Sequence, residues 1–201
     1  MVIKIYPQNP NEKSIAQVVD VLRNDGVIIY PTDGVYAYGC SVQSPKAIER
    51  IKTIKRKKEG TFSIMCADLS GIADYAKVDT PTFKLLKRNL PGPFTFILKA
   101  SSKVPDKVLA RRKTIGVRIA DNPVTLAIVS ELGSPMITSS VRSYDEILEY
   151  ATDPELIAEQ WGGDVDAVVD GGYGNNVPTT LVDLSDGEIE ILREGGGELL
   201  E

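Results

Sequence analysis

Four polar residues that stand directly before a proline constrain the fold of this chain most strongly. They lie at Ser44-Pro45, Thr80-Pro81, Asn122-Pro123 and Asp153-Pro154. Serine, threonine, asparagine and aspartate cap helix N-termini, and proline at the first helical position gives up no hydrogen bond. The sequence therefore predicts helices that begin at these pairs, in addition to a helix over residues 11–24.

Short apolar runs alternate with these helices and predict strands. The runs cover residues 3–6, 27–30, 61–66, 94–99, 115–119, 136–138, 167–169, 180–184 and 189–192. This alternation indicates a mixed α/β sheet, and the turn at 185–187 makes the last two strands an antiparallel hairpin. Because no low-complexity linker divides the 201 residues, we expect a single domain over residues 1–201, with a mobile tail at 195–201.

The composition limits the chemistry that is open to the chain. No apolar run approaches the roughly 18 to 20 residues of a membrane span, and the N-terminus does not resemble a secretory signal, so we expect a cytoplasmic protein without a membrane partner. The sequence contains no histidine, which excludes Ser-His-Asp and Cys-His catalysis and the usual zinc sites. Cys40 and Cys66 are too few for a disulfide framework and are expected to be buried free thiols.

Two early segments carry residues that suit a ligand-binding site. A buried-strand pattern ends in Pro31-Thr32-Asp33-Gly34, where glycine lets the backbone approach a ligand and the neighbours supply a hydroxyl and a carboxylate. The basic run at residues 55–58 lies between a helix and a strand and indicates phosphate binding, with a solvated charged loop as the alternative.

Later segments add hydroxyls and cations. Thr138-Ser139-Ser140 ends a strand ahead of Arg142, and such hydroxyls bind phosphate or a nucleoside, or cap the backbone locally. Arg118 lies inside an apolar strand and needs an anionic partner, so an ion pair and a ligand contact are both open. The turns at 90–95 and 111–113 are interpreted as architectural and solvated, and no dinucleotide-binding or P-loop motif is present.

Together these segments resemble the YrdC/YciO family of threonylcarbamoyl-AMP synthase-like proteins over nearly the whole chain, and the YciO branch most of all. Residues 31–39 resemble the family's Pro-Thr-Asp-Gly-x-Tyr-x-x-Gly opening, and residues 192–195 its Leu-Arg-x-Gly signature. The family's Lys-x-Arg motif falls on residues 55–57, with lysine at Lys57, and its Ser-x-Asn motif on residues 140–142, with arginine at Arg142.

The resemblance implies a twisted, open mixed sheet flanked by helices around a central basic cavity. It also implies ATP, L-threonine and bicarbonate as ligands, Mg²⁺ accompanying ATP, and a reaction that forms threonylcarbamoyl-AMP and pyrophosphate for tRNA modification. The residues it implies are Thr32 for threonine, Lys55 and Lys57 for phosphate, Thr138 and Ser140 for nucleotide phosphate or ribose, and Arg193 for the adenylate side, with Tyr36, Arg118 and Arg142 as further candidates. No nucleophile, general base or metal ligand is assigned.

Two other functions are compatible with the same residues. The first is a diverged protein that binds nucleotide or double-stranded RNA without synthase turnover, which the departures at Lys57 and Arg142 allow. The second is a hydrolase of a related adenylate, in which Asp33 would orient water. The proposed synthase chemistry itself relies on positioning and electrostatics, so it does not require histidine.

Overall fold

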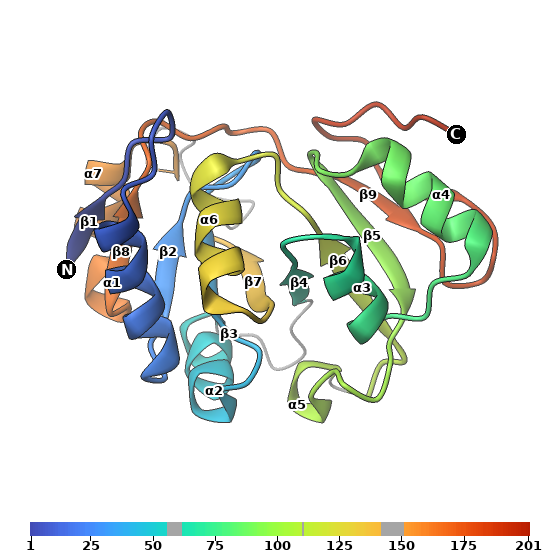
Figure 1. Cartoon of the computed structure of the whole chain (residues 1–201), viewed down its shortest axis with the longest axis horizontal. Coiled ribbons are helices and arrows are strands. Elements are labelled where there is room, and N and C mark those ends of the chain that lie inside the picture. The colour runs from blue at the N-terminus through green and yellow to red at the C-terminus, as the bar shows by residue number, and fades with distance from the viewer. Residues whose placement is uncertain (56–61, 110, 142–150) are drawn as a thin grey trace.

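The computed structural model describes residues 1–55, 62–109, 111–141 and 151–201 (Figure 1). Its strands are β1 (Val2–Lys4), β2 (Ile28–Tyr30), β3 (Ala37–Ser41), β4 (Ser63–Met65), β5 (Phe94–Lys99), β6 (Thr114–Arg118), β7 (Met136–Ser140), β8 (Ala167–Asp170), β9 (Thr180–Asp183) and β10 (Glu190–Arg193). Its helices are α1 (Glu12–Arg23), α2 (Pro45–Ile54), α3 (Leu69–Tyr75), α4 (Thr80–Asn89), α5 (Asp106–Leu109), α6 (Pro123–Leu132) and α7 (Pro154–Trp161), and a 3₁₀ turn, η2, covers Gly162–Asp164.

These strands pair into one mixed sheet in the order β1-β8-β2-β3-β7-β4-β6-β5-β9-β10. Parallel pairs join β1 to β8, β8 to β2, β4 to β6 and β5 to β9, and the remaining neighbours are antiparallel. The sheet is open because β1 and β10 lie at opposite ends of this order. The predicted mixed α/β class and the antiparallel hairpin of the last two strands are therefore confirmed.

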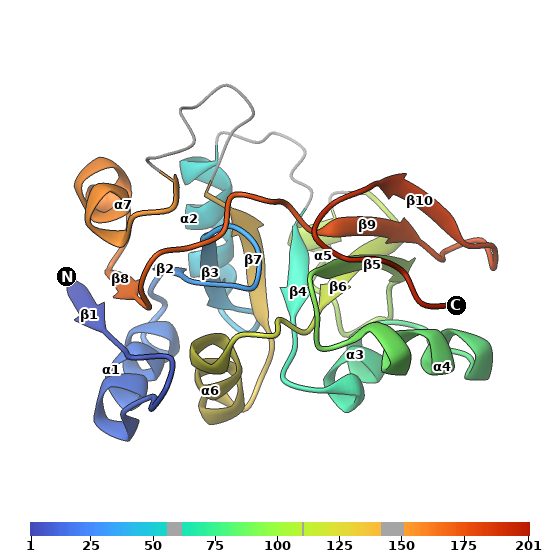
Figure 2. The same ribbon diagram turned by 90° about the horizontal axis from the view of Figure 1, so that it is seen from above.

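Helices cover both faces of the sheet. Figure 2 shows α1, α6, α3 and α4 on one side and α2 and α7 on the other. One buried cluster joins the apolar faces of α1 and α6 to side chains of the sheet, and a second, larger cluster includes buried residues of α2, α3, α4 and α7. This packing follows from the helical spacing of the apolar residues in α1, whose Ile15, Val18, Val19 and Leu22 are all buried.

The predicted helix starts are found at three of the four proline pairs as expected. Ser44, Asn122 and Asp153 cap α2, α6 and α7, and each side chain accepts a hydrogen bond from a backbone N–H in the first turn. The fourth start is one residue earlier than predicted. Asp79 is the cap of α4 and accepts a hydrogen bond from the amide of Thr82 at 2.9 Å, so Thr80 is already helical.

Four described elements were not predicted: the strand β3, the helices α3 and α5, and the 3₁₀ turn η2. The sequence predicted ligand-binding residues at 31–34 and no strand after them, whereas the structure returns the chain after a loop at 31–36 and pairs β3 between β2 and β7. Gly39 is needed in this strand because a Cβ there would lie 2.7 Å from the ring of Tyr30. The small residues of β3 therefore serve close packing against the neighbouring strand, which periodicity alone does not reveal.

The remaining expectations concern the thiols, the tail and the membrane. Cys40 and Cys66 are buried free thiols, as predicted. The mobility of residues 195–201 stays a prediction; in the structure the amide of Leu200 donates to Asn89 Oδ1 at 2.9 Å, and Asn89 Nδ2 donates to the carbonyl of Leu200 at 2.8 Å. Within the described residues, the helices are too short or too polar to cross a bilayer.

Candidate functional site

A cavity of about 620 Å³ lies over one face of the strands β7, β4, β6, β5 and β9. This volume falls within the range of ordinary ligand pockets. Its walls combine apolar side chains with hydroxyls and cations, and none of the described lining residues carries a carboxylate. The lining residues with hydroxyls are Ser63, Thr95, Thr114, Thr138, Ser139, Ser140 and Thr179, and those with positive charge are Lys55, Arg112, Arg118 and Arg193.

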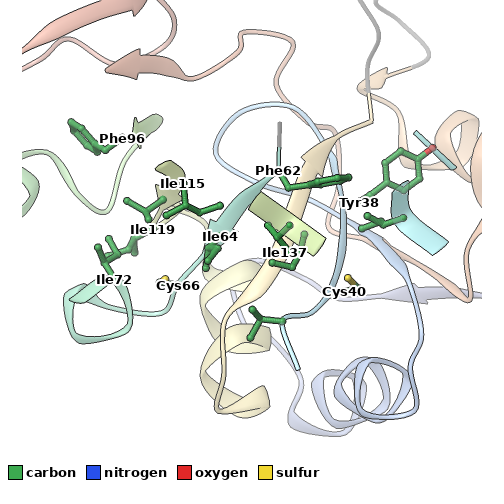
Figure 3. Close-up of a cluster of buried hydrophobic side chains, with 14 of the residues drawn as sticks. Tyr38, Cys40, Phe62, Ile64, Cys66, Ile72, Phe96, Ile115, Ile119 and Ile137 are labelled. Atoms are coloured by element: carbon green, nitrogen blue, oxygen red, sulfur yellow. The ribbon is translucent and has the colours of Figure 1, made fainter. Parts of the chain in front are cut away.

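The polar floor of the cavity follows from the two-residue repeat of β-strands. Alternate residues of a strand point to the same face, and Thr114, Gly116 and Arg118 of β6 all line the cavity. Apolar residues close other parts of the wall, among them Phe62 and Ile115, which Figure 3 shows in the buried cluster beneath. The cavity wall thus combines hydroxyls of the strands with apolar side chains such as Ile115, which also belongs to the buried core.

Gly116 keeps the floor of the cavity flat. A Cβ at this position would lie 2.5 Å from Ser63 Oγ and 3.1 Å from Thr95 Cγ2. Ser63 and Gly116 are register partners across the parallel pair of β4 and β6, so the two strands leave no room for a side chain between them. Glycine therefore allows both neighbouring hydroxyl residues to approach the cavity.

Arg118 and Asp33 form a buried ion pair at the end of the cavity. Arg118 Nη2 donates to Asp33 Oδ1 at 2.7 Å, and the two side chains are 8% and 7% exposed. The other carboxylate oxygen, Asp33 Oδ2, accepts a hydrogen bond from the amide of Asp121 at 2.8 Å. Because both oxygens are engaged in holding the fold, the structure gives no support to the hypothesis that Asp33 orients a water molecule.

Arg118 also retains an unused donor. Its Nε is buried and has no hydrogen-bond partner among the residues that the structure describes. A buried donor left in this state costs about 1 to 3 kcal/mol, and an oxygen of a bound anion would remove that cost. Of the two roles left open by the sequence, the structure shows the ion pair directly, and the position of Arg118 in the cavity wall keeps the ligand contact open.

Lys55 reaches the cavity from the C-terminus of α2. Its Nζ donates to the backbone carbonyl of Ser140 at 2.5 Å and lies 5.5 Å from the centre of the Tyr38 ring. Ser140 is the last residue of β7, so the lysine connects the helix end to the strand end. This arrangement places an ammonium group at the end of β7, whose Thr138, Ser139 and Ser140 line the same cavity.

Thr138 lines the cavity on the same strand. Its Oγ1 and the hydroxyl of Tyr30 are 2.7 Å apart in a buried hydrogen bond. Burial raises the pKa of Tyr30 to about 12, although the hydrogen bond to Thr138 acts in the opposite direction. Tyr30 therefore remains neutral at ordinary pH and fixes the rotamer of Thr138 from beneath.

Arg193 lies at the opposite wall, at the end of β10. Its Nε and Nη2 donate to the backbone carbonyl of Thr179 at 3.1 and 2.9 Å. The hydroxyl of Thr179 is in turn 2.8 Å from that of Thr95. Hydrogen bonds thus connect Arg193 through Thr179 to Thr95 on the floor of the cavity.

Two predicted residues do not line the cavity. The Thr32 hydroxyl donates to the carbonyl of Val35 at 2.8 Å and accepts from the amide of Gly34 at 3.0 Å, so it shapes the loop that brings Val35 to the cavity wall. The Tyr36 hydroxyl donates to the carbonyl of Gly172 at 2.7 Å. Burial raises the pKa of Tyr36, whose role in the structure is to attach the segment after β8.

The structure brings together Lys55, Arg118, Thr138, Ser140 and Arg193, which were predicted for the site. Lys57 and Arg142 lie outside the described residues. Sequence reasoning missed Ser63, Thr95, Thr114, Gly116 and Thr179, and it interpreted Arg112 as part of a solvated turn. Residues without apolar side chains at alternate positions of a strand, as in Thr114-x-Gly116-x-Arg118, were the available signal.

The fold and the cavity define the class of protein: a mixed α/β protein whose cavity, floored by hydroxyls and bordered by cations, suits an anionic ligand. The chain belongs to the Sua5/YciO/YrdC family, whose family model, described as telomere recombination, matches residues 20–195. It is 42% identical to the uncharacterized protein YciO of Escherichia coli K12 over 198 residues, 97% of this chain and 95% of that protein. It is 29% identical to the threonylcarbamoyl-AMP synthase of Vibrio vulnificus over 187 residues, 90% of this chain and 98% of that protein.

Solved structures agree with this assignment. The crystal structure of E. coli YciO matches with a TM-score of 0.92 at 40% identity and covers 98% of this chain and 97% of its own. The structure of Sua5 from P. abyssi complexed with L-threonine matches with a TM-score of 0.89 at 25% identity. That match covers 98% of this chain and 58% of the Sua5 chain, so the resemblance concerns the domain described above.

Proposed function

We propose that the cavity binds ATP and that the protein forms threonylcarbamoyl-AMP from ATP, L-threonine and bicarbonate. The observation that carries this proposal is the gathering of Lys55, Arg112, Arg118 and Arg193 around one hydroxyl-lined cavity. Four cations with no described carboxylate in the wall favour a ligand with several negative charges. The related threonylcarbamoyl-AMP synthase and the relative solved with L-threonine support the same substrates.

The proposed chemistry needs no protein nucleophile. The amine of threonine and bicarbonate form a carbamate and water, and a carbamate oxygen then attacks the α-phosphorus of ATP while pyrophosphate leaves. The contribution of the protein is to hold the reactants in line and to stabilise the charge that develops on the phosphates. Positioned cations and hydroxyl donors supply both effects, and the absence of histidine from the chain is no obstacle.

In this proposal Lys55 binds the phosphates, and Thr138 and Ser140 donate to phosphate or ribose oxygens. Arg193 lies at the other wall of the cavity and is assigned to the adenylate side. The unpartnered Nε of Arg118 adds a donor for a further oxygen of a bound ligand.

The remaining assigned residues carry less structural support. Lys57 keeps the phosphate role and Arg142 the candidate role that the family resemblance implies, and both lie outside the described residues. Thr32 acts on the threonine end through the loop that it shapes, because its own hydroxyl does not reach the cavity wall.

Magnesium enters this proposal as part of the substrate, bound to the phosphates of ATP. Within the described residues, no group of three or more histidine, cysteine, aspartate or glutamate side chains is placed to hold a metal ion. In this proposal the phosphates of ATP bind the magnesium ion. The arginine and lysine side chains of the cavity form charge-assisted hydrogen bonds with the nucleotide.

The test is pyrophosphate release from MgATP by the purified protein, measured with threonine and bicarbonate together and with each alone. The proposal expects release only when both are present. Saturable ATP binding without release under any condition would contradict turnover and would favour the second candidate, a nucleotide- or RNA-binding protein without synthase activity. No ATP binding at all would overturn both nucleotide roles.

The second candidate keeps the same cavity but predicts a different salt dependence. Double-stranded RNA held through several phosphates should lose affinity steeply as salt increases, because each contact releases counterions. A single nucleotide enclosed in the cavity should lose less. Titrating the protein with both ligands at low and physiological salt therefore distinguishes a duplex-binding surface from a nucleotide pocket.

A further inference from the structure

Tyr38 presents an aromatic ring to the ammonium group of Lys55. Tyr38 lies in the centre of β3, where it is the register partner of Ile29 on β2 and Ser139 on β7. Its side chain is only 3% exposed and belongs to the large buried cluster, where Figure 3 shows it as one of the labelled residues. A residue held on both sides by neighbouring strands is a rigid platform.

Two of the groups that contact the ammonium of Lys55 are the Ser140 carbonyl and the Tyr38 ring. The carbonyl oxygen of Ser140 accepts a hydrogen bond from Lys55 Nζ at 2.5 Å, and the centre of the Tyr38 ring lies 5.5 Å from the same nitrogen. A cation within about 6 Å of an aromatic ring is attracted by its quadrupole. Lysine has a long flexible side chain. The Tyr38 ring, in addition to the Ser140 carbonyl, therefore restricts the ammonium group to the end of β7, in the cavity wall.

We propose that Tyr38 is a positioning residue for the anion site: its ring holds Lys55 in the cavity wall, although Tyr38 itself does not line the cavity. The inference rests on the proposed binding of ATP and deepens it, because it assigns part of the phosphate affinity to a side chain buried behind the site. The ring, and not the hydroxyl, is the feature that acts.

The chain offers a matched control for this contact. Lys4 Nζ lies 5.5 Å from the centre of the Tyr6 ring, the same distance as in the Lys55 pair. Tyr6 follows β1, at the end of the sheet order away from the strands that form the cavity floor, and neither Lys4 nor Tyr6 lines the cavity. Replacing Tyr6 by leucine removes the same kind of contact without touching the site.

The test measures ATP affinity by titration calorimetry for the wild type and for Tyr38→Leu, Tyr38→Phe and Tyr6→Leu. We expect Tyr38→Leu to weaken ATP binding about 2- to 10-fold, the range that a cation–π contact supplies, and Tyr38→Phe and Tyr6→Leu to bind as the wild type does. Urea unfolding of each variant establishes that the protein is folded at the titration temperature.

A double-mutant cycle separates positioning from a general structural effect. In a Lys55→Ala background, Tyr38→Leu should cause no further loss of affinity, because the group that the ring positions is absent. An equal loss in both backgrounds, or a loss in Tyr38→Phe as large as in Tyr38→Leu, would overturn the proposal while leaving ATP binding intact. If the wild type itself binds no ATP, the proposed function fails and this inference fails with it.

Discussion

The Arg118–Asp33 pair joins two parts of the chain that are 85 residues apart. Asp33 belongs to the loop after β2, and Arg118 ends β6, so the pair connects the loop to the floor of the cavity. Its two side chains are almost fully buried, and one of them keeps an unpartnered nitrogen. The site therefore contains a buried guanidinium, that of Arg118, which is paired with the Asp33 carboxylate. Its Nε–H has no partner among the described residues and can donate to a ligand.

Replacing Asp33 by asparagine should destabilise the protein strongly. The change leaves the Arg118 guanidinium buried without its counter-charge, and breaking a buried pair in this way costs about 3 to 5 kcal/mol. The exposed pair of Lys103 and Asp74, with a similar distance of 2.8 Å, provides the control, and Asp74→Asn should change stability little. Urea unfolding of both variants measures this difference, and equal stability for the two would show that the buried pair is not structurally important.

Three buried side chains, Tyr30, Cys40 and Cys66, make the free energy of unfolding depend on pH in the alkaline range. Burial raises the pKa of each to about 12, above the values of about 10 for tyrosine and about 8.5 for cysteine in an unfolded chain. The unfolded state therefore loses these protons first, and the folded state binds more protons between the two values. The free energy of unfolding must then fall as the pH rises above about 9, and is fully retained below that pH.

The measurement is the free energy of unfolding in urea at about pH 8 and about pH 10.5 for the wild type and Tyr30→Phe. The variant also loses the hydrogen bond to Thr138, which lowers its stability at both pH values. The free energy of unfolding of Tyr30→Phe should fall less between the two pH values than that of the wild type. An identical decline in both proteins would contradict the assignment of part of the effect to Tyr30.

At the scale of elements, the cavity depends on how β4, β6 and β5 lie side by side. Gly116 in the central strand of this group is flanked by Ser63 and Thr95, and a Cβ there would meet both. The strands themselves were predictable, since Phe94–Lys99 was placed without error and the neighbouring runs within one or two residues. The order of the strands in the sheet was not predictable from their apolar patterns.

Gly116→Ala should destabilise the sheet by about 1 to 3 kcal/mol, because the added methyl group overpacks a filled space. Adding Ser63→Ala removes the oxygen at 2.5 Å and should restore part of the lost stability. Thermal unfolding of the single and double variants provides the measurement. Additive losses without any recovery would contradict the close approach of Ser63 to this glycine.

The sequence predicted the cations of the site better than its floor. Lys55 and Arg118 were recognised because a charge at an element junction or in an apolar strand is conspicuous, and Arg193 was recognised from the family's Leu-Arg-x-Gly signature. Thr95 and Thr114 were not, because a threonine in a strand is ordinary, and Thr179 lies just before β9. Only the strand order shows that these hydroxyls lie at one cavity. Thr32 was assigned from its place in the opening segment, but the local turn uses its hydroxyl, which a sequence pattern does not disclose.

The whole molecule is a twisted sheet that carries its helices on both faces and its cavity on one of them. Residues far apart in the chain meet there: Lys55 from α2, Ser140 from β7 and Arg193 from β10. The net charge of the chain is −5, so the cations of the cavity stand out against a negative background. An anion approaching this protein is attracted to the cavity more than to the surface as a whole.

Titration of the protein with ATP, before and after replacement of Lys55 by alanine, tests this account most directly. A charge-assisted contact to phosphate contributes about 1.5 to 3 kcal/mol, so Lys55→Ala should weaken ATP binding roughly 10- to 150-fold. Lys52→Ala is the control, since Lys52 lies one turn earlier on α2, pairs with Glu49 and does not line the cavity. Saturable binding that Lys55→Ala weakens and Lys52→Ala preserves is the predicted result, whereas unchanged affinity in Lys55→Ala would contradict the central role of this cavity.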